Sequence, residues 1–136
     1  MLFVGDSFIF AFENHYPFKK VISGKEIWFY YDMVWSGFNK KELKLNKINK
    51  LKSVLNADYV VFYSVGHSWW KGTGTFVDDI LRDIKDPEKV RVAQMMIEIE
   101  KNPEWMESIR AKAKDKGITE QEMLELDAKW ILEHKK

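Results

Sequence analysis

The stretch Leu2-Phe3-Val4-Gly5-Asp6-Ser7-Phe8 decides the fold that the sequence predicts. Leu2 to Val4 is a short apolar run and predicts a β-strand. Gly5 permits a tight turn, and Ser7 begins a segment with helical spacing that extends to about His15. A strand that leads through glycine and serine into a helix presents the serine hydroxyl beside the amides of the helix N-terminus. The stretch therefore predicts the first strand of a sheet and a candidate nucleophile.

Two further runs of β-forming residues predict the rest of the sheet. Ile27 to Tyr31 lies between Gly24 and a predicted turn at Ser36-Gly37. Tyr59 to Val65 is nearly continuous apolar and aromatic sequence, which is typical of a strand buried on both faces. Between the two runs, Asn46 to Leu55 has helical spacing and predicts a helix that covers the sheet. This alternation predicts an α/β fold with a three-stranded parallel sheet and right-handed crossovers.

The rest of the sequence predicts helices. Phe76 to Ile84 makes the first, and Asp86-Pro87 and Asn102-Pro103 each combine an N-cap residue with a first-turn proline. These two helices would run to about Lys101 and to Lys116, where Gly117 ends the second one. Thr119 and Glu122 form a capping box for a last helix. The C-terminal half is therefore predicted to be a helical hairpin or small bundle.

Length and composition suit one globular domain. The chain has 136 residues, of which 46% are hydrophobic, and we expect a single domain with a parallel-sheet unit in residues 1–75 and a helical extension in residues 76–136. The 22 basic and 21 acidic residues leave a net charge of only +1, so we expect no nucleic-acid partner and no attraction to an anionic membrane. The absence of cysteine excludes disulfides, a thiol nucleophile and cysteine-based zinc sites. We expect neither a cofactor nor a metal.

The apolar start of the chain is not predicted to be a signal peptide. It lacks a basic segment at its beginning, and Gly5, Asp6 and Ser7 interrupt its apolar run. No other run is long enough to predict a membrane span. The compartment stays open, although the chain as it stands would be cytoplasmic.

Gly5-Asp6-Ser7 after an apolar strand resembles the first block of the SGNH, or GDSL-type, hydrolase family. The chain is also similar to the C-terminal portion of bacterial SGNH-like proteins related to alginate O-acetyltransferases, where an aromatic strand like Trp28-Phe29-Tyr30-Tyr31 follows the Gly-Asp-Ser strand. The helical ending from Asn102 to Trp130 resembles theirs as well. The resemblance implies a flavodoxin-like or SGNH-like half domain. It also implies ester hydrolysis or acyl transfer, with a carbohydrate ester as substrate.

The resemblance assigns roles to several residues. Ser7 corresponds to the nucleophile, and Gly5 and Asp6 complete its block. By position, Gly37 is the nearest counterpart of the glycine that donates to the oxyanion. The family's third block, Gly-x-Asn-Asp, corresponds to Gly66, His67, Ser68 and Trp69, so a serine replaces the oxyanion asparagine.

The family's Asp-x-x-His block, which supplies the general base, has no match here. Asp127 and His134 come nearest, but they lie seven positions apart. Two explanations fit: the chain is the C-terminal piece of a longer enzyme whose base lies upstream, or it has abandoned triad chemistry or rebuilt it with His67. A serine without a base is a poor nucleophile, because its hydroxyl stays protonated at neutral pH.

Each candidate also has a simpler interpretation. Asp6 and Ser7 would serve equally as helix caps, and His67 as a packing residue in the loop after the third strand. Trp69 and Trp70, like Trp35 and Phe38, are predicted in loops, where they would either stack on sugar rings or pack against the rest of the protein. The competing class of function is a non-catalytic domain that binds a partner or ligand through the loops at the C-terminal ends of the strands. The open edges of a small sheet also suggest self-association or a missing partner domain.

Overall fold

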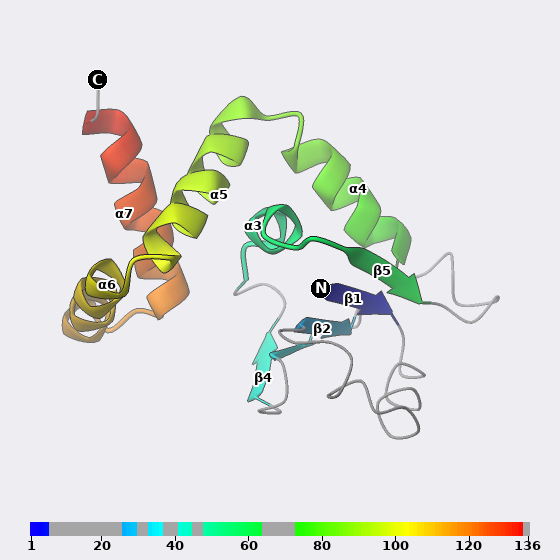
Figure 1. The fold of residues 1–136 in the computed structure, drawn as a ribbon, viewed down its shortest axis with the longest axis horizontal. Coiled ribbons are helices and arrows are strands. Elements are labelled where there is room, and N and C mark those ends of the chain that lie inside the picture. Colours follow the sequence, from blue (N-terminus) through cyan, green and yellow to red (C-terminus); the bar gives the residue numbers. More distant parts are fainter. Residues whose placement is uncertain (6–25, 30–32, 37–40, 45–47, 64–72, 135–136) are drawn as a thin grey trace. The chain divides into compact units, whose positions relative to one another are not determined.

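The computed structural model describes residues 1–5, 26–29, 33–36, 41–44, 48–63 and 73–134 (Figure 1). They belong to two compact units. The sheet unit comprises residues 1–48 and 57–81, and the helical unit comprises residues 49–56 and 82–136.

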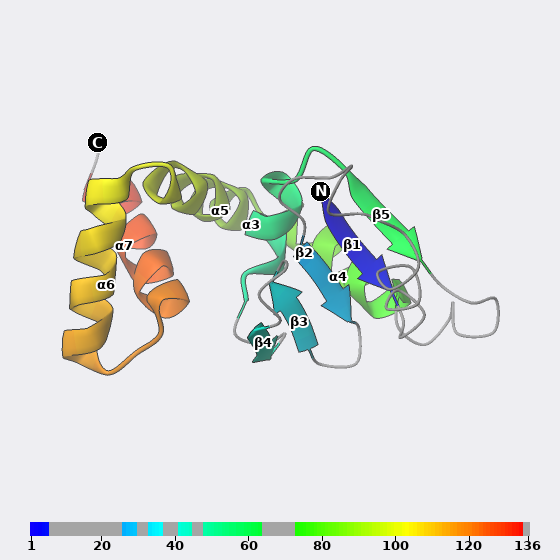
Figure 2. The same cartoon turned by 60° about the horizontal axis from the view of Figure 1, so that its bottom comes forward.

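The described residues of the sheet unit form a mixed sheet of five strands in the order β4-β3-β2-β1-β5. Its strands are β1 (Leu2–Gly5), β2 (Glu26–Phe29), β3 (Met33–Ser36), β4 (Lys41–Lys44) and β5 (Val60–Tyr63). β1 pairs in parallel with β2 and with β5, whereas β3 pairs antiparallel with β2 and with β4 (Figure 2). The predicted three-stranded parallel sheet is therefore wrong, and most of the described residues are helical.

The two strands missing from the prediction come from short connections. Three residues separate β2 from β3 and four separate β3 from β4, and such short links join antiparallel neighbours. Met33-Val34-Trp35 contains β-forming residues, but the Ser36-Gly37 pair was interpreted as a turn that follows a single strand. Ser36 instead ends β3, and Trp35 lies within that strand rather than in a loop.

The burial of the sheet differs between its centre and its β5 edge. In β1, Leu2 is 1% exposed and Val4 is fully buried. β5 is the outermost strand, and the side chains of Val61 and Phe62 are 36% and 41% exposed. The prediction that this strand is buried on both faces is wrong. A nearly continuous apolar sequence does not indicate whether a strand lies in the centre of a sheet or at its edge.

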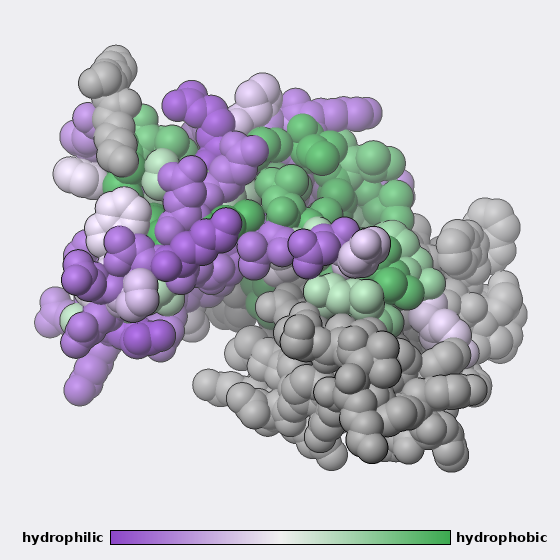
Figure 3. Space-filling model, viewed as in Figure 1, coloured by the Kyte–Doolittle hydropathy of each residue, from purple (hydrophilic) through white to green (hydrophobic). Residues whose placement is uncertain are grey.

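Helix α4 (Thr73–Asp83) follows and packs on β5. The rings of Phe62 and Phe76 meet edge to face with their centroids 5.9 Å apart, and Phe76 is buried. The helix begins three residues before its predicted start at Phe76. Figure 3 shows hydrophobic side chains gathered over α4 and β5.

The helical unit confirms the helix boundaries that capping residues predicted. α5 (Pro87–Glu100) begins after Asp86, whose Oδ1 accepts a hydrogen bond from the Glu88 amide at 3.0 Å. α6 (Pro103–Lys116) begins after Asn102 and ends at Gly117, which has a left-handed φ of 66°. The capping box of Thr119 and Glu122 precedes α7 (Glu120–His134), with reciprocal bonds of 2.9 and 3.1 Å.

The core of the helical unit is apolar and comes from three helices. It contains residues of α5, α6 and α7 that are at most 5% exposed, namely Val92, Met96, Ile99, Ile109, Ala113, Met123, Leu124 and Ala128. Met96, Ile109 and Met123 fall on the faces that their spacing predicted to be apolar.

Helix α3 (Lys50–Leu55) belongs to the helical unit and packs on α5. It begins at Lys50 rather than at the predicted Asn46, because the Asn49 side chain accepts from the Lys52 amide and caps the helix. The Lys52 ammonium pairs with Glu100 of α5 and is 3.4 Å from Oε1 of Gln121. Within the ranges that the structure describes, no helix is both long enough and apolar enough to cross a membrane.

Candidate functional site

The three parallel strands end together at one edge of the sheet. In the register, Gly5 of β1 lies opposite Phe29 of β2 on one side and Tyr63 of β5 on the other. In the sequence, Ser7 comes two residues after Gly5 and His67 comes four residues after Tyr63. The strands that precede these two residues in the sequence are therefore neighbours, and they end at the same edge of the sheet. In open α/β sheets, the carboxyl edge of the parallel strands is where ligands bind.

Gly5 occupies a position that accepts no side chain. A Cβ built on Gly5 would clash with the carbonyl oxygen of Tyr63 and would lie 3.2 Å from the Tyr63 Cβ. The residue is buried and paired on both sides. The glycine of the Gly-Asp-Ser block is therefore required by the close approach of β1 to β5. The sequence predicts a tight turn at Gly5, whereas the structure has it as the last residue of β1.

Most of the predicted site residues lie outside the described ranges. These are Asp6, Ser7, Gly37, Gly66, His67, Ser68, Trp69 and Trp70. Their assignments as nucleophile, base, oxyanion donors and substrate contacts stay predictions. Of the predicted site, the structure describes Gly5 and the ends of the strands that precede the other residues.

Asp127 and His134, the nearest pieces of an Asp-x-x-His block, have separate partners. Oδ2 of Asp127 accepts a hydrogen bond from Nζ of Lys112 at 2.6 Å. Nδ1 of His134 is 2.8 Å from the carbonyl oxygen of Trp130 and so donates its proton to it, and the His134 ring stacks on the Trp130 ring at 4.5 Å. Asp127 thus links α7 to α6, whereas His134 contacts a residue of its own helix, and the two are not paired with each other as a catalytic dyad.

The basic neighbours of Asp83 determine the ionisation of its carboxyl group. The hydrogen bond from Lys89, at 2.6 Å, lowers the pKa of the Asp83 carboxyl below its usual value, and Arg82 acts in the same direction. Asp83 therefore stays ionised at neutral pH and is unsuited to be a general acid. In the ranges that the structure describes, no group of three or more His, Asp or Glu side chains could hold a metal ion.

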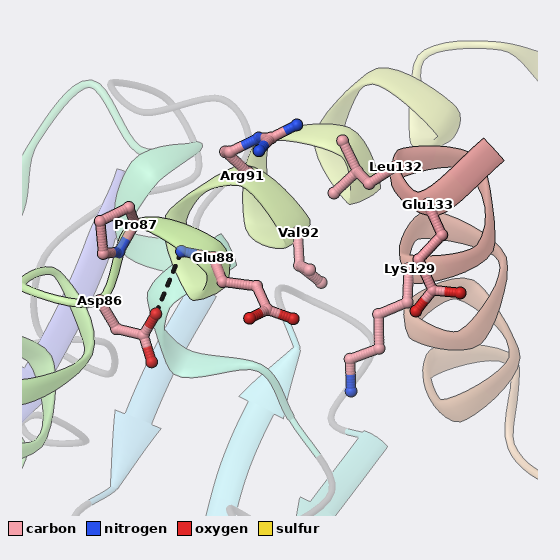
Figure 4. A pocket seen from close by; sticks show the side chains of 8 residues that line it. All are labelled: Asp86, Pro87, Glu88, Arg91, Val92, Lys129, Leu132 and Glu133. Carbon is pink, nitrogen blue, oxygen red and sulfur yellow. Dashed lines mark hydrogen bonds between the residues drawn. The ribbon is translucent and has the colours of Figure 1, made fainter. Parts of the chain in front are cut away.

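A separate pocket of about 480 Å³ lies in the helical unit, between the start of α5 and the end of α7 (Figure 4). Its lining residues are Asp86, Pro87, Glu88, Arg91, Val92, Lys129, Leu132 and Glu133. Figure 4 shows side chains of both charge signs around the apolar Val92 and Leu132. All of the lining residues that the structure describes belong to the helical unit.

Sequence reasoning did not identify this pocket, although its residues carry a regular signal. Glu88 and Arg91 are three positions apart, and Lys129 and Glu133 are four apart, which is the spacing of neighbours on one helix face. Such spacing is typical of solvated helix surfaces and does not reveal that two helices meet there. Lys129 also pairs with Glu125 at 2.7 Å, so part of the charge around the pocket has a partner within its own helix.

The chain was compared with protein-family models, with curated proteins and with solved structures, and none of the three comparisons gave a match.

Proposed function

We propose that this chain is an SGNH-like esterase or O-acyltransferase-type domain that acts on a carbohydrate ester through Ser7. The observation that carries the proposal is the position of Gly5. It is the last residue of β1, it lies between two parallel strands that end at the same edge, and it has no room for a side chain. Ser7 follows this glycine by two positions in the sequence, and ligands of open α/β sheets bind beyond the carboxyl ends of the parallel strands, which supports the proposal.

In the proposed reaction, Oγ of Ser7 attacks the carbonyl carbon of the ester while its proton passes to the imidazole of His67. The negative charge on the former carbonyl oxygen is stabilised by the Ser7 amide, with Gly37 and Ser68 as further donors. Collapse of the tetrahedral intermediate releases the alcohol, which takes the proton from His67. Water or an acceptor hydroxyl then attacks the acyl-Ser7 ester and gives its proton to His67. As the second tetrahedral intermediate collapses, Oγ of Ser7 leaves and takes that proton back from His67, and the acid or the new ester is released.

We expect little or no turnover from the isolated chain. Asp127 bonds Lys112, and His134 bonds the Trp130 carbonyl, so neither residue is arranged as the orienting acid or the base of a triad. Ser68 also replaces the oxyanion asparagine that the resemblance implies. Without an oriented base and a full set of oxyanion donors, formation of the acyl-enzyme loses much of its rate.

Fluorophosphonate labelling tests the nucleophile directly, because it requires attack by the serine but no turnover. We expect the wild-type chain to be labelled. The extent of labelling of Ser7→Ala should be at least about tenfold lower than that of the wild type. The matched control is Ser108→Ala, since Ser108 is an exposed serine of α6. It should be labelled like the wild type.

Histidine variants test the base in the same assay. His67→Gln should slow labelling by about a hundredfold, which is the usual contribution of a general base. His134→Gln should leave the rate unchanged, because His134 is exposed and bonded to a backbone carbonyl. If wild type and Ser7→Ala label equally, the chain is not a serine enzyme, and a non-catalytic binding domain becomes the better interpretation.

We also propose that the β5 edge of the sheet is covered when the protein functions, either by self-association or by another domain. The exposed Val61 and Phe62 support this proposal.

A further inference from the structure

The two outer strands of the sheet differ in charge. β4 has the sequence Lys-Glu-Leu-Lys, and such charged residues prevent an edge strand from pairing with other chains. β5, at the opposite edge, has the sequence Val-Val-Phe-Tyr and carries no charge. Its side chains are also accessible, since Val61 is 36% and Phe62 is 41% exposed. One edge of the sheet is therefore protected against pairing and the other is not.

The pairing of β5 with β1 determines which of its backbone groups point outward. The Leu2 amide donates to the Tyr59 carbonyl at 2.8 Å, and Leu2 lies opposite Val60 in the parallel register. Backbone groups alternate in direction along a strand, so those of Tyr59 and Val61 point toward β1. The N–H and C=O groups of Val60 and Phe62 point to the outer edge, where no described strand pairs with them.

These groups restrict how a second copy of the strand can pair. In an antiparallel pair of strands, directly opposite residues form two alternating kinds of pair. In one kind the two residues exchange both backbone hydrogen bonds, and in the other kind they exchange none. A two-fold axis at Val61 satisfies this condition. It places Val60 opposite Phe62 of the other copy, with mutual hydrogen bonds, and places the two Val61 residues opposite each other.

The side chains suit this register. It forms two pairs of a β-branched residue with an aromatic residue, and such cross-strand pairs each contribute favourably to a sheet. No charged residue of β5 meets its own copy, so the contact has no like-charge repulsion. Beside β5, α4 adds apolar surface in Val77 and Leu81, which are 36% and 52% exposed (Figure 3).

We propose that β5 is a self-association edge: two copies of this chain pair through β5, antiparallel about a two-fold axis at Val61, and form one continuous sheet. Assembly stops at the dimer, because the two-fold axis uses the β5 edge of both copies. The remaining outer strand of each copy is the charged β4, which does not favour further pairing. This inference rests on the proposal that the β5 edge is covered, and it names the partner as a second copy of the chain.

Cysteine cross-linking tests this register, because the native chain contains no cysteine. Opposite residues of a non-hydrogen-bonded antiparallel pair have Cα atoms about 4.5 Å apart, which is within the range of a disulfide. We expect Val61→Cys to form a covalent dimer on mild oxidation, at least about tenfold faster than the control Leu126→Cys. Leu126 is an apolar residue of α7 that is 49% exposed, so a cysteine there is at least as accessible as one at position 61, and it lies far from β5 in sequence.

Light scattering on the full chain gives an independent measurement. The wild type should approach twice its 16.2 kDa mass as its concentration rises. Val61→Lys should remain monomeric with an unchanged circular dichroism spectrum, because two opposed ammonium groups would repel each other at the axis. A monomeric wild type, a dimeric Val61→Lys, or Val61→Cys that cross-links no faster than Leu126→Cys would each overturn the proposal. Neither measurement involves Ser7, so Ser7→Ala should dimerise normally, and a negative labelling experiment would leave this result unaffected.

Discussion

At the scale of single residues, Gly5 shows how a motif position is determined by packing. Its position before the serine predicts a glycine that permits a turn. The structure gives it a different task, because the Tyr63 carbonyl lies where a side chain would begin. The requirement comes from a residue 58 positions away in the chain, which no local pattern contains.

Gly5→Ala should therefore destabilise the protein by about 1–3 kcal/mol, since the added methyl group forces β1 and β5 apart. Urea denaturation followed by circular dichroism measures the loss. The comparison variant is Gly117→Ala, whose Cβ would meet nothing within 4 Å but whose φ of +66° is unfavourable for alanine. It should cost roughly 1 kcal/mol through the backbone alone. A Gly5→Ala protein as stable as the wild type would show that β5 does not approach β1 so closely.

At the scale of elements, the helices of the C-terminal half follow from local chemistry. The Asn102 side chain accepts hydrogen bonds from the amides of Glu104 and Trp105 at 3.0 and 3.2 Å. Pro103 then occupies the first helical position, where its missing N–H costs nothing. These interactions span only a few residues, so the sequence contains everything that is needed to predict them.

Asn102→Ala should lower the free energy of unfolding by about 1 kcal/mol, because two amides of the first turn of α6 lose their acceptor. Asn102→Asp retains an acceptor oxygen and should stay within about 0.5 kcal/mol of the wild type. The same denaturation measurement applies. Equal stabilities for the alanine and aspartate variants would mean that the cap contributes nothing.

At the scale of the whole molecule, each unit combines parts of the chain that are distant in sequence. The helical unit takes up residues 49–56, which lie between two strands of the sheet unit in the sequence. Lys52 is central to this arrangement: its side chain is 10% exposed, and its ammonium pairs with Glu100 of α5. A nearly buried charge needs such a partner, because burial without one is costly.

Glu100→Ala should reduce the stability of the helical unit by roughly 1–3 kcal/mol, since it leaves the Lys52 ammonium without its anionic partner. Glu98→Ala, at an exposed position of the same helix, is the matched control and should change stability by less than about 0.5 kcal/mol. Thermal and urea denaturation of both variants measure the difference. If both variants unfold alike, the Lys52–Glu100 pair does not hold α3 to α5.

Much of the helical content could be predicted from the sequence, and much of the sheet could not. The starts of α5, α6 and α7 were predicted correctly from Asp86, Asn102 and the Thr119 capping box, and β1, β2 and β5 from their apolar runs. The strands β3 and β4 were missed, because Met33 to Lys44 is a short stretch whose role depends on pairing with β2. Of the candidate site, Ser7 and His67 stay predictions, and Gly5 is explained only by its contact across strands.

The sequence by itself determined where the helices begin and end, because caps, prolines and Gly117 act within a few residues of their own position. The tertiary structure alone decided the order of the strands, the exposure of β5 and the need for a glycine at position 5. These properties depend on which strands become neighbours. The free energy of that choice comes from contacts between residues far apart in the chain, which local patterns do not specify.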